Sequence, residues 1–134
     1  MKGKKNDIVV KKSKISNKGV FANRNFKKGE VVLSWNPKAL KESEVEKIPT
    51  DKRHYIYKSV DNGYFLMQSP EKYVNHSCDA NTEARNGRDV AIKDIKKGEE
   101  ITSDYTRQGS STSFICTCGT EKCRGFIKRF DLKI

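Results

Sequence analysis

The sequence predicts a mainly β fold with few and short helices. Three observations lead to this class: short apolar runs such as Val31-Val32-Leu33, frequent turn signals that contain Gly or Asn-Gly, and only one clear helix candidate. The apolar runs are spread along all 134 residues, although hydrophobic residues make up only 34% of them. We therefore expect a single small folded domain rather than a disordered chain.

The first half of the chain is expected to form three strands and then two short helices. Each strand is an apolar run between turn residues, and the first helix has Ser43 and Glu46 at the spacing of a capping box and Pro49 at its end. The expected strands cover residues 8–13, 20–22 and 31–35, with turns at residues 17–19 and 27–30 between them and Pro37 after the last. The expected helices cover residues 38–47 and 52–59.

The second half is expected to return to strands. Asn86-Gly87 is one of the clearest turn dipeptides in the chain and predicts a hairpin. The expected strands cover residues 64–68, the hairpin 85–92 and residues 101–105, and residues 108–113 form a Gly/Ser/Thr-rich linker. The turns at residues 26–30 and 95–99 are near copies, which indicates an internal duplication or, as we favour here, the reuse of a good β-turn.

The charge of the chain gives a weaker indication of function. The net charge of +11 suggests an association with nucleic acid. However, Lys outnumbers Arg 21 to 7 and aromatic residues are not interleaved with them, so a solvated lysine-rich surface is the favoured interpretation. No apolar run has the ~20 residues of a membrane helix, and the basic residues 1–5 lack the apolar segment of a signal peptide. We therefore expect no membrane association and a cytoplasmic protein, or a nuclear one if it is an effector targeted to a host.

All four cysteines lie in two segments and suggest one shared metal site. Cys116, Cys118 and Cys123 are close together in the sequence, and Cys78 is the candidate fourth ligand. Thiolates are the preferred ligands of closed structural Zn²⁺ sites. The alternatives are unrelated thiols or two disulfides, and the missing signal peptide and the close Cys-x-Cys pair favour zinc over both.

Three polar residues are candidates for chemistry, and each also has a plainer interpretation. Tyr105 ends the last expected strand, where packing is the default role of a tyrosine, and Asn-His pairs such as Asn75-His76 mostly cap turns. His54 is the only other histidine, so neither a catalytic triad nor a histidine metal cluster is expected. A shared zinc site would leave no thiol for nucleophilic catalysis.

Four motifs, taken in order, resemble the SET domain, the fold of most protein lysine methyltransferases. Each motif is weak alone, but the ordered set is highly specific. The motifs are Ser16-Asn17-Lys18-Gly19-Val20-Phe21-Ala22, Asn75-His76-Ser77-Cys78-Asp79-Ala80-Asn81, Gly98-Glu99-Glu100-Ile101-Thr102-Ser103-Asp104-Tyr105, and Cys116-Thr117-Cys118-Gly119 through Cys123-Arg124-Gly125, which resembles the family's post-SET zinc module. Three residues depart from the family pattern: Asn17 replaces a turn glycine, Ala80 replaces a proline, and Ser103 replaces an aromatic residue.

The resemblance implies a SET domain of short, β-clip-like sheets with a pseudoknot in residues 1–107, followed by a linker and a post-SET zinc-binding segment in residues 108–134. It implies S-adenosyl-L-methionine as the methyl donor, a structural Zn²⁺, and Tyr105 as the catalytic residue. The implied cofactor-binding residues are Lys18, Gly19, Val20, Tyr64, Asn75 and His76, with Ile127 over the adenine. The implied metal ligands are Cys78, Cys116, Cys118 and Cys123.

The function that follows from the resemblance is a protein-lysine N-methyltransferase, whose partner is a protein substrate that presents a lysine, such as a histone. The alternative is a SET-like binding module without activity that holds a protein or nucleic-acid partner, and the retained Tyr105 and Asn75-His76 argue against it. A zinc-stabilised nucleic-acid-binding protein rests on charge alone and would show strongly salt-dependent binding. The target lysine, the number of methyl groups and the choice between monomer and dimer stay open.

Overall fold

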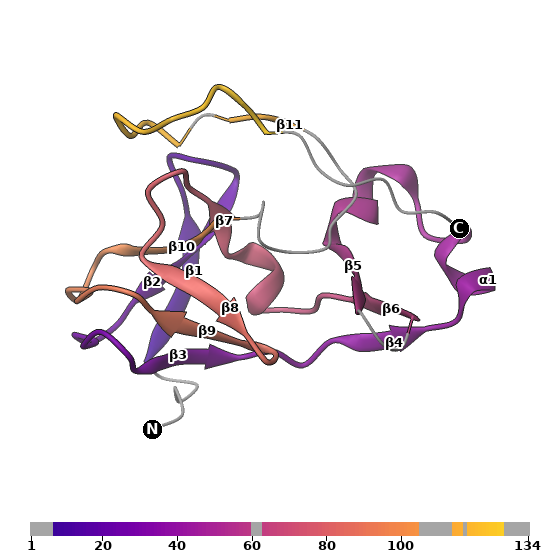
Figure 1. The fold of residues 1–134 in the computed structure, drawn as a ribbon, viewed down its shortest axis with the longest axis horizontal. Helices are drawn as coiled ribbons and strands as arrows, with labels where there is room; N and C mark the ends of the chain where they lie inside the picture. The colour runs from indigo at the N-terminus through magenta and orange to yellow at the C-terminus, as the bar shows by residue number, and fades with distance from the viewer. Residues whose placement is uncertain (1–6, 60–62, 105–113, 117, 128–134) are drawn as a thin grey trace.

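The chain folds into short strands with little helix, as the sequence predicts (Figure 1). The computed structural model describes residues 7–59, 63–104, 114–116 and 118–127. The strands in these ranges are β1 (Ile8–Lys12), β2 (Lys18–Ala22), β3 (Val31–Ser34), β4 (Lys38–Leu40), β5 (Ile56–Ser59), β6 (Gly63–Leu66), β7 (Asn75–His76), β8 (Thr82–Arg85), β9 (Arg88–Ala91), β10 (Glu100–Ser103), β11 (Phe114–Ile115) and β12 (Phe126–Ile127). The helices are α1 (Glu42–Val45) and the 3-10 turns η1 (Thr50–Tyr55) and η2 (Glu71–Tyr73), and none of those described has the length and apolar character that a membrane crossing requires.

The largest sheet brings distant segments of the chain together. Its order is β1-β2-β10-β8-β9-β3, and β7 also pairs with β10. β1 and β2 form an antiparallel hairpin, whereas β7 and β8 both run parallel to β10. β2 and β7 both pair with β10, and the Asn75 Nδ2 donates to the Lys18 carbonyl at 2.8 Å, so Asn75 lies beside the β1–β2 hairpin. The buried core of this sheet consists of Val20, Ala22, Phe26, Val32, Leu33, Val74, Ala91, Ile95 and Ile101.

The hairpin between β8 and β9 forms where the sequence predicts it. Asn86 has a φ of 49° and Gly87 a φ of 75°, so both central residues adopt the positive φ that a two-residue hairpin turn requires. The strands predicted at residues 8–13, 20–22, 31–35 and 64–68 are also confirmed, with ends that differ by one or two residues. The strand predicted at residues 101–105 is found up to Ser103, and Tyr105 and the predicted linker at residues 108–113 lie outside the described residues.

The helix predicted at residues 38–47 is wrong over much of its length. Residues 38–40 form β4, which pairs with β6 and directs Leu40 into a second, smaller core. Helix α1 covers only Glu42–Val45, and the N–H of its N-cap residue Lys41 donates to Glu44 Oε1 at 2.9 Å in place of the predicted Ser43–Glu46 capping box. Strand pairing and burial of Leu40 thus override a weak helical preference.

The helix predicted at residues 52–59 is wrong in its second half. The 3-10 turn η1 ends at Tyr55, and β5 follows, with Ile56 paired opposite Leu66 of β6. β4, β6 and β5 form a separate three-stranded sheet. Its core consists of Leu40, Val45, Ile56 and Tyr64, and Figure 1 shows this sheet and α1 on the side of the molecule away from β1 and β2.

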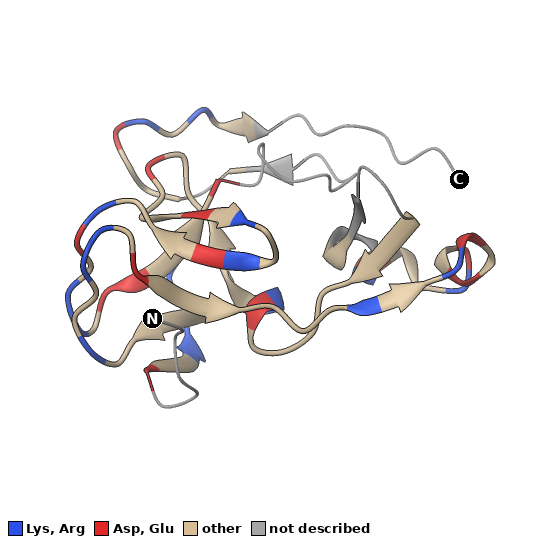
Figure 2. Cartoon of the chain, turned by 60° about the horizontal axis from the view of Figure 1, so that its bottom comes forward, with Lys and Arg blue, Asp and Glu red and all other residues tan. Residues whose placement is uncertain are grey.

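The two near-identical turns lie against each other. Phe26 and Ile95 exchange backbone hydrogen bonds of 2.7 and 2.8 Å. In each turn the glutamate Oε1 accepts the N–H of the first lysine, at 2.8 Å for Lys27 and 2.7 Å for Lys96. Figure 2 shows acidic residues next to the lysines here, so these turns carry mixed charge rather than an unbroken basic face.

Candidate cofactor and zinc site

The four cysteines come together between the main sheet and the C-terminal segment. Their Sγ atoms all lie within 4.8 Å of one another, and the Sγ atoms of Cys78 and Cys116 are 3.8 Å apart. Four thiolates at ~2.3 Å from a tetrahedral zinc lie about 3.8 Å from each other, so the donor set and its spacing fit Zn²⁺. The predicted clustering of Cys78, Cys116, Cys118 and Cys123 is therefore confirmed, and these four residues could hold the ion.

Two neighbouring residues contact the sulfur of Cys78. The Arg124 N–H and the Arg124 Nε both donate to the Cys78 Sγ at 3.3 Å. The His76 Nε2 lies 3.4 Å from the same sulfur. Outer hydrogen bonds of this kind orient metal ligands and tune their charge.

The thiols of Cys116 and Cys118 differ in how readily they lose a proton. Burial raises the pKa of the Cys116 thiol to about 12. Burial also acts to raise the pKa of Cys118, but hydrogen bonds from the Thr120 hydroxyl and from backbone groups outweigh it and lower this pKa to about 5. Cysteines bind zinc as thiolates, so loading of the cluster releases protons and weakens at low pH.

Asn75, on β7, has its side-chain amide fixed by its neighbours. The Nδ2 donates to the Lys18 carbonyl at 2.8 Å and to Glu100 Oε2 at 2.8 Å, and Ser13 Oγ lies 3.3 Å away. The Lys18 carbonyl and the Glu100 carboxylate are acceptors only, which sets the orientation of the amide. The Asn75 Oδ1 therefore faces away from both acceptors and can accept a hydrogen bond from a ligand.

Glu100 is a site residue that the sequence analysis missed. Ser13 Oγ donates to its carboxylate at 2.8 Å, in addition to the bond from Asn75. A Cβ atom on Gly19 would lie 2.4 Å from Glu100 Oε2 and 2.9 Å from Ser13 Cβ. The close approach of Ser13 and of the hydrogen-bonded Glu100 carboxylate thus favours glycine at position 19. The sequence analysis attributed this glycine to the approach of a cofactor instead.

Two ammonium groups share the ring of Tyr73 near Asn75. The Lys18 Nζ lies 5.3 Å from the ring centroid and the Lys72 Nζ lies 5.0 Å from it, and Lys72 is also 5.5 Å from the ring of Tyr55. Cation–π attraction favours each ammonium at this ring. Lys72 was not predicted, because no spacing distinguishes one lysine in so lysine-rich a chain.

The remaining predicted cofactor residues have other described surroundings. Val20 is fully buried in the main core, so only its backbone is available to a ligand. Tyr64 is 6% exposed and packs in the core of the small sheet. The His76 ring lies between Cys78 and Asp104, with its Nδ1 3.7 Å from Asp104 Oδ1. The cofactor roles of these three residues stay predictions.

A zinc-binding cysteine cluster beside a polar site on a small mixed sheet agrees with the family that the comparisons identify. The SET domain family matches residues 17–106, and the chain therefore belongs to the SET-domain family, as its motifs predicted.

Curated relatives share low identity over nearly the whole chain. Human "Histone-lysine N-methyltransferase 2B" is 27% identical over 149 residues, which cover 94% of this chain and 5% of the relative. The Schizosaccharomyces pombe "Histone-lysine N-methyltransferase, H3 lysine-4 specific" is 24% identical over 147 residues, 95% of this chain and 16% of the relative. The Neurospora crassa "H3 lysine-9 specific dim-5" enzyme is 37% identical over 92 residues, 51% of this chain and 27% of the relative. The chain thus spans only a small part of each of these relatives.

Solved structures confirm the predicted fold. The methyltransferase domain of human SETMAR has a TM-score of 0.75 at 20% identity, covering 93% of this chain and 59% of its own. A Plasmodium falciparum putative histone methyltransferase has a TM-score of 0.64 at 23% identity, covering 76% and 95%. A complex described as "ctPRC2 in an autoinhibited conformation bound to S-adenosylmethionine" has a TM-score of 0.63 at 24% identity, covering 75% and 15%.

Proposed function

We propose that this chain is a protein-lysine N-methyltransferase that takes its methyl group from S-adenosylmethionine. The observation that carries the proposal is the polar site around Asn75, whose oriented amide contacts the Glu100 carboxylate and the Lys18 carbonyl. The ring of Tyr73, two residues earlier in the chain, holds the ammonium groups of Lys18 and Lys72. Membership of the SET-domain family and relatives named histone-lysine N-methyltransferases support it, as does a structural neighbour described with S-adenosylmethionine bound.

The charges of this site fit the amino-acid end of the cofactor. That end carries an ammonium and a carboxylate group. Glu100 and the Asn75 Oδ1 could accept hydrogen bonds from the ammonium, and Lys18 or Lys72 could pair with the carboxylate. Both halves of a zwitterion thus find a complementary group, with the backbone of Lys18, Gly19 and Val20 beside them.

Methyl transfer requires the protein to align the two reactants and to keep the substrate lysine amine neutral. When bound, S-adenosylmethionine supplies a methyl group on a cationic sulfonium. A free lysine has a pKa of ~10.4, so the site must hold the substrate lysine in its neutral form, which burial in an apolar channel favours. Tyr105 would orient the amine through its hydroxyl, and alignment of the two reactants would supply much of the rate.

For the substrate we propose a basic protein of the histone class, because several relatives are named for that activity. The chain itself has a net charge of +11, which opposes the approach of a free basic tail. We therefore expect a histone bound to DNA to be the better substrate. The nucleus is then the expected place of action, and a cytoplasmic location is expected if another protein is the target.

Replacing Tyr105 by phenylalanine tests the proposal. We expect methyl transfer from labelled S-adenosylmethionine to fall by about 10²-fold or more, because the hydroxyl that positions the amine is lost. Label is measured in free histones, in nucleosomes and in a whole-protein extract. Cofactor affinity, measured by calorimetry, should stay unchanged. A wild-type chain that binds no S-adenosylmethionine would overturn the proposal, and one that binds it without labelling any substrate would favour the inactive module.

Replacing Gly19 by alanine is expected to weaken cofactor binding about tenfold. The new Cβ would force the Glu100 carboxylate from its bonds to Ser13 and Asn75, at the ~1–3 kcal/mol typical of overpacking. Calorimetry with S-adenosylmethionine measures the affinity, and thermal unfolding measures the stability. In a Glu100→Ala background the same change should cost less, since the carboxylate is gone. An equal cost in both backgrounds would contradict this account of Gly19.

A further inference from the structure

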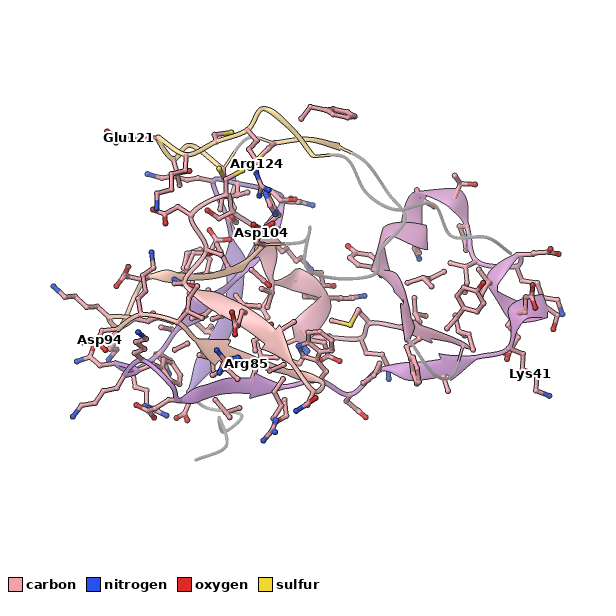
Figure 3. The ribbon with its side chains drawn as sticks, viewed as in Figure 1. Lys41, Arg85, Asp94, Asp104, Glu121 and Arg124 are labelled. Atoms are coloured by element: carbon pink, nitrogen blue, oxygen red, sulfur yellow. The ribbon has the colours of Figure 1, made fainter. Side chains whose placement is uncertain are left out.

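Arg124 connects the zinc cluster to the end of β10. It lies in the loop between β11 and β12, immediately after the zinc ligand Cys123. Figure 3 shows Arg124 and Asp104 beside each other, between the C-terminal segment and the main sheet, whereas Glu121 lies at the outer tip of that segment. Asp104 directly follows β10 and directly precedes Tyr105 in the sequence.

Four side chains form a closed ring of contacts, which we call the Arg124 ring: Cys78, Arg124, Asp104 and His76. The Arg124 N–H and Nε donate to Cys78 Sγ at 3.3 Å, and the Arg124 Nη2 lies 2.9 Å from both carboxylate oxygens of Asp104. Asp104 Oδ1 is 3.7 Å from His76 Nδ1, and His76 Nε2 is 3.4 Å from Cys78 Sγ. The ring thus returns to the sulfur at which it begins.

The ring depends on the shape of the guanidinium group. Its Nε and Nη2 lie on one rigid edge, so a single side chain can donate to a sulfur and a carboxylate at once, which one lysine ammonium cannot do with the same geometry. Arg124 is 42% exposed and Asp104 24%, so the ion pair by itself adds little stability. The ring instead fixes the position of Arg124, because its Nε is held by Cys78 and its Nη2 by Asp104.

The ring also includes the strand pair next to the proposed cofactor site. His76 lies in β7 opposite Ser103 of β10, and the Ser77 N–H donates to the Ser103 carbonyl at 3.1 Å. His76 is 3% exposed, so its ring has little freedom to turn away from Asp104 and Cys78. Movement of Cys78 or Arg124 would therefore shift Thr102 and Asp104, the neighbours of Ser103 in the chain.

We propose that Arg124 is a positioning residue: it transmits the arrangement of the zinc-bound cluster through Asp104 to the segment that carries Tyr105. This inference rests on the proposed function for its effect on methyl transfer. Its effect on metal binding does not depend on that function. Asp104 acts on the metal through Arg124, which contacts the ligand Cys78, so the effects of these two residues on zinc affinity are not independent.

A double-mutant cycle on the full chain tests the ring through metal affinity. The variants are Arg124→Gln, Asp104→Asn and the double variant, with Glu121→Gln as the matched control in the same loop. Zinc affinity is measured by competition with a chromophoric chelator, and circular dichroism checks that each variant folds. We expect Arg124→Gln to lose ~10–100-fold in affinity, as is usual for outer-shell partners, and the double variant to lose no more than Arg124→Gln alone.

Methyl transfer with saturating zinc gives the second readout. We expect Arg124→Gln and Asp104→Asn to lower kcat about tenfold or more, Arg124→Lys to restore little of it, and Glu121→Gln to leave it unchanged. Wild-type zinc affinity in Arg124→Gln, additive losses in the cycle, or an unchanged kcat at full zinc occupancy would each overturn the inference. A wild-type chain that transfers no methyl group would overturn the proposed function alone, because the metal-affinity cycle would still decide whether the ring exists.

Discussion

Replacing Cys78 by serine should release the C-terminal segment from the domain and abolish tight zinc binding. Cys78 is the only cysteine outside residues 116–123, so it alone can connect a bound metal to the main sheet. The other described contacts between the segment and the domain include the partly exposed pairs of Arg124 with Asp104 and of Lys122 with Asp79, and such pairs are weak. Within the segment, β11 and β12 are two residues each, and a small two-stranded pair is at best marginally stable. Structural zinc contributes ~10–16 kcal/mol in small zinc-binding peptides, which makes the metal the main source of order here.

The loss should stay local. The main core, from Val20 to Ile101, includes no zinc ligand, so we expect the large sheet to remain folded. Zinc content by mass spectrometry should fall from one ion per chain to none, and hydrogen exchange should rise in residues 114–127. Treatment of the wild-type chain with a chelator should reproduce both changes, and added zinc should reverse them. Retention of one zinc at wild-type affinity in Cys78→Ser would contradict the four-cysteine assignment.

Features set by local chemistry could be predicted from the sequence. Asn86-Gly87 specifies its hairpin because both positions must adopt positive φ. The cysteine cluster could be predicted because four thiols in two segments, three of them closely spaced, are typical of one shared zinc site. The order of the motifs gave the family, although Ser103 and Ala80 depart from its pattern.

Features set by contacts between distant segments could not be predicted. Residues 38–40 show no strong preference of their own and become a strand because β6 pairs with them. Glu100 joins the site through Ser13, 87 positions away, and Arg124 through Cys78, 46 positions away. Glu100 and Arg124 both lie within the family motifs, but the motifs do not show which residues they contact, and only the fold places each against its partner.

Asp89 should make the stability of the fold fall as the pH rises. Asp89 is 1% exposed on β9, and one of its oxygens has no hydrogen-bond partner among the described residues, as is also true of the nearby acid Glu71. Burial raises the pKa of Asp89 to about 7, Glu71 adds to the increase, and the hydrogen bond from Trp35 Nε1 at 2.8 Å opposes it. The folded state therefore favours the protonated carboxyl.

The sign of the pH effect follows from this raised pKa. An unfolded aspartate has a pKa of ~3.9, so between that value and about 7 the folded chain holds a proton that the unfolded chain has lost. The protonated Asp89 therefore contributes about 4 kcal/mol to the free energy of unfolding below pH ~3.9. This contribution decreases as the pH rises and is lost by pH about 7. Urea unfolding at several pH values measures this loss. In Asp89→Asn this contribution should be absent, so the stability should fall less than in the wild-type chain between pH ~3.9 and about 7.

Trp35 offers a direct probe of the same proton. It is the only tryptophan in the chain, and its indole N–H donates to Asp89, so its fluorescence should change with a midpoint near pH 7 as the carboxyl ionises. Asp89→Asn should remove the transition, while Asp94→Asn, which alters an exposed aspartate on a turn, should leave it in place. A fluorescence signal that is flat from pH 5 to 9 would show that Asp89 keeps an ordinary pKa. In that case a bound proton would not compensate the unpartnered oxygen of Asp89.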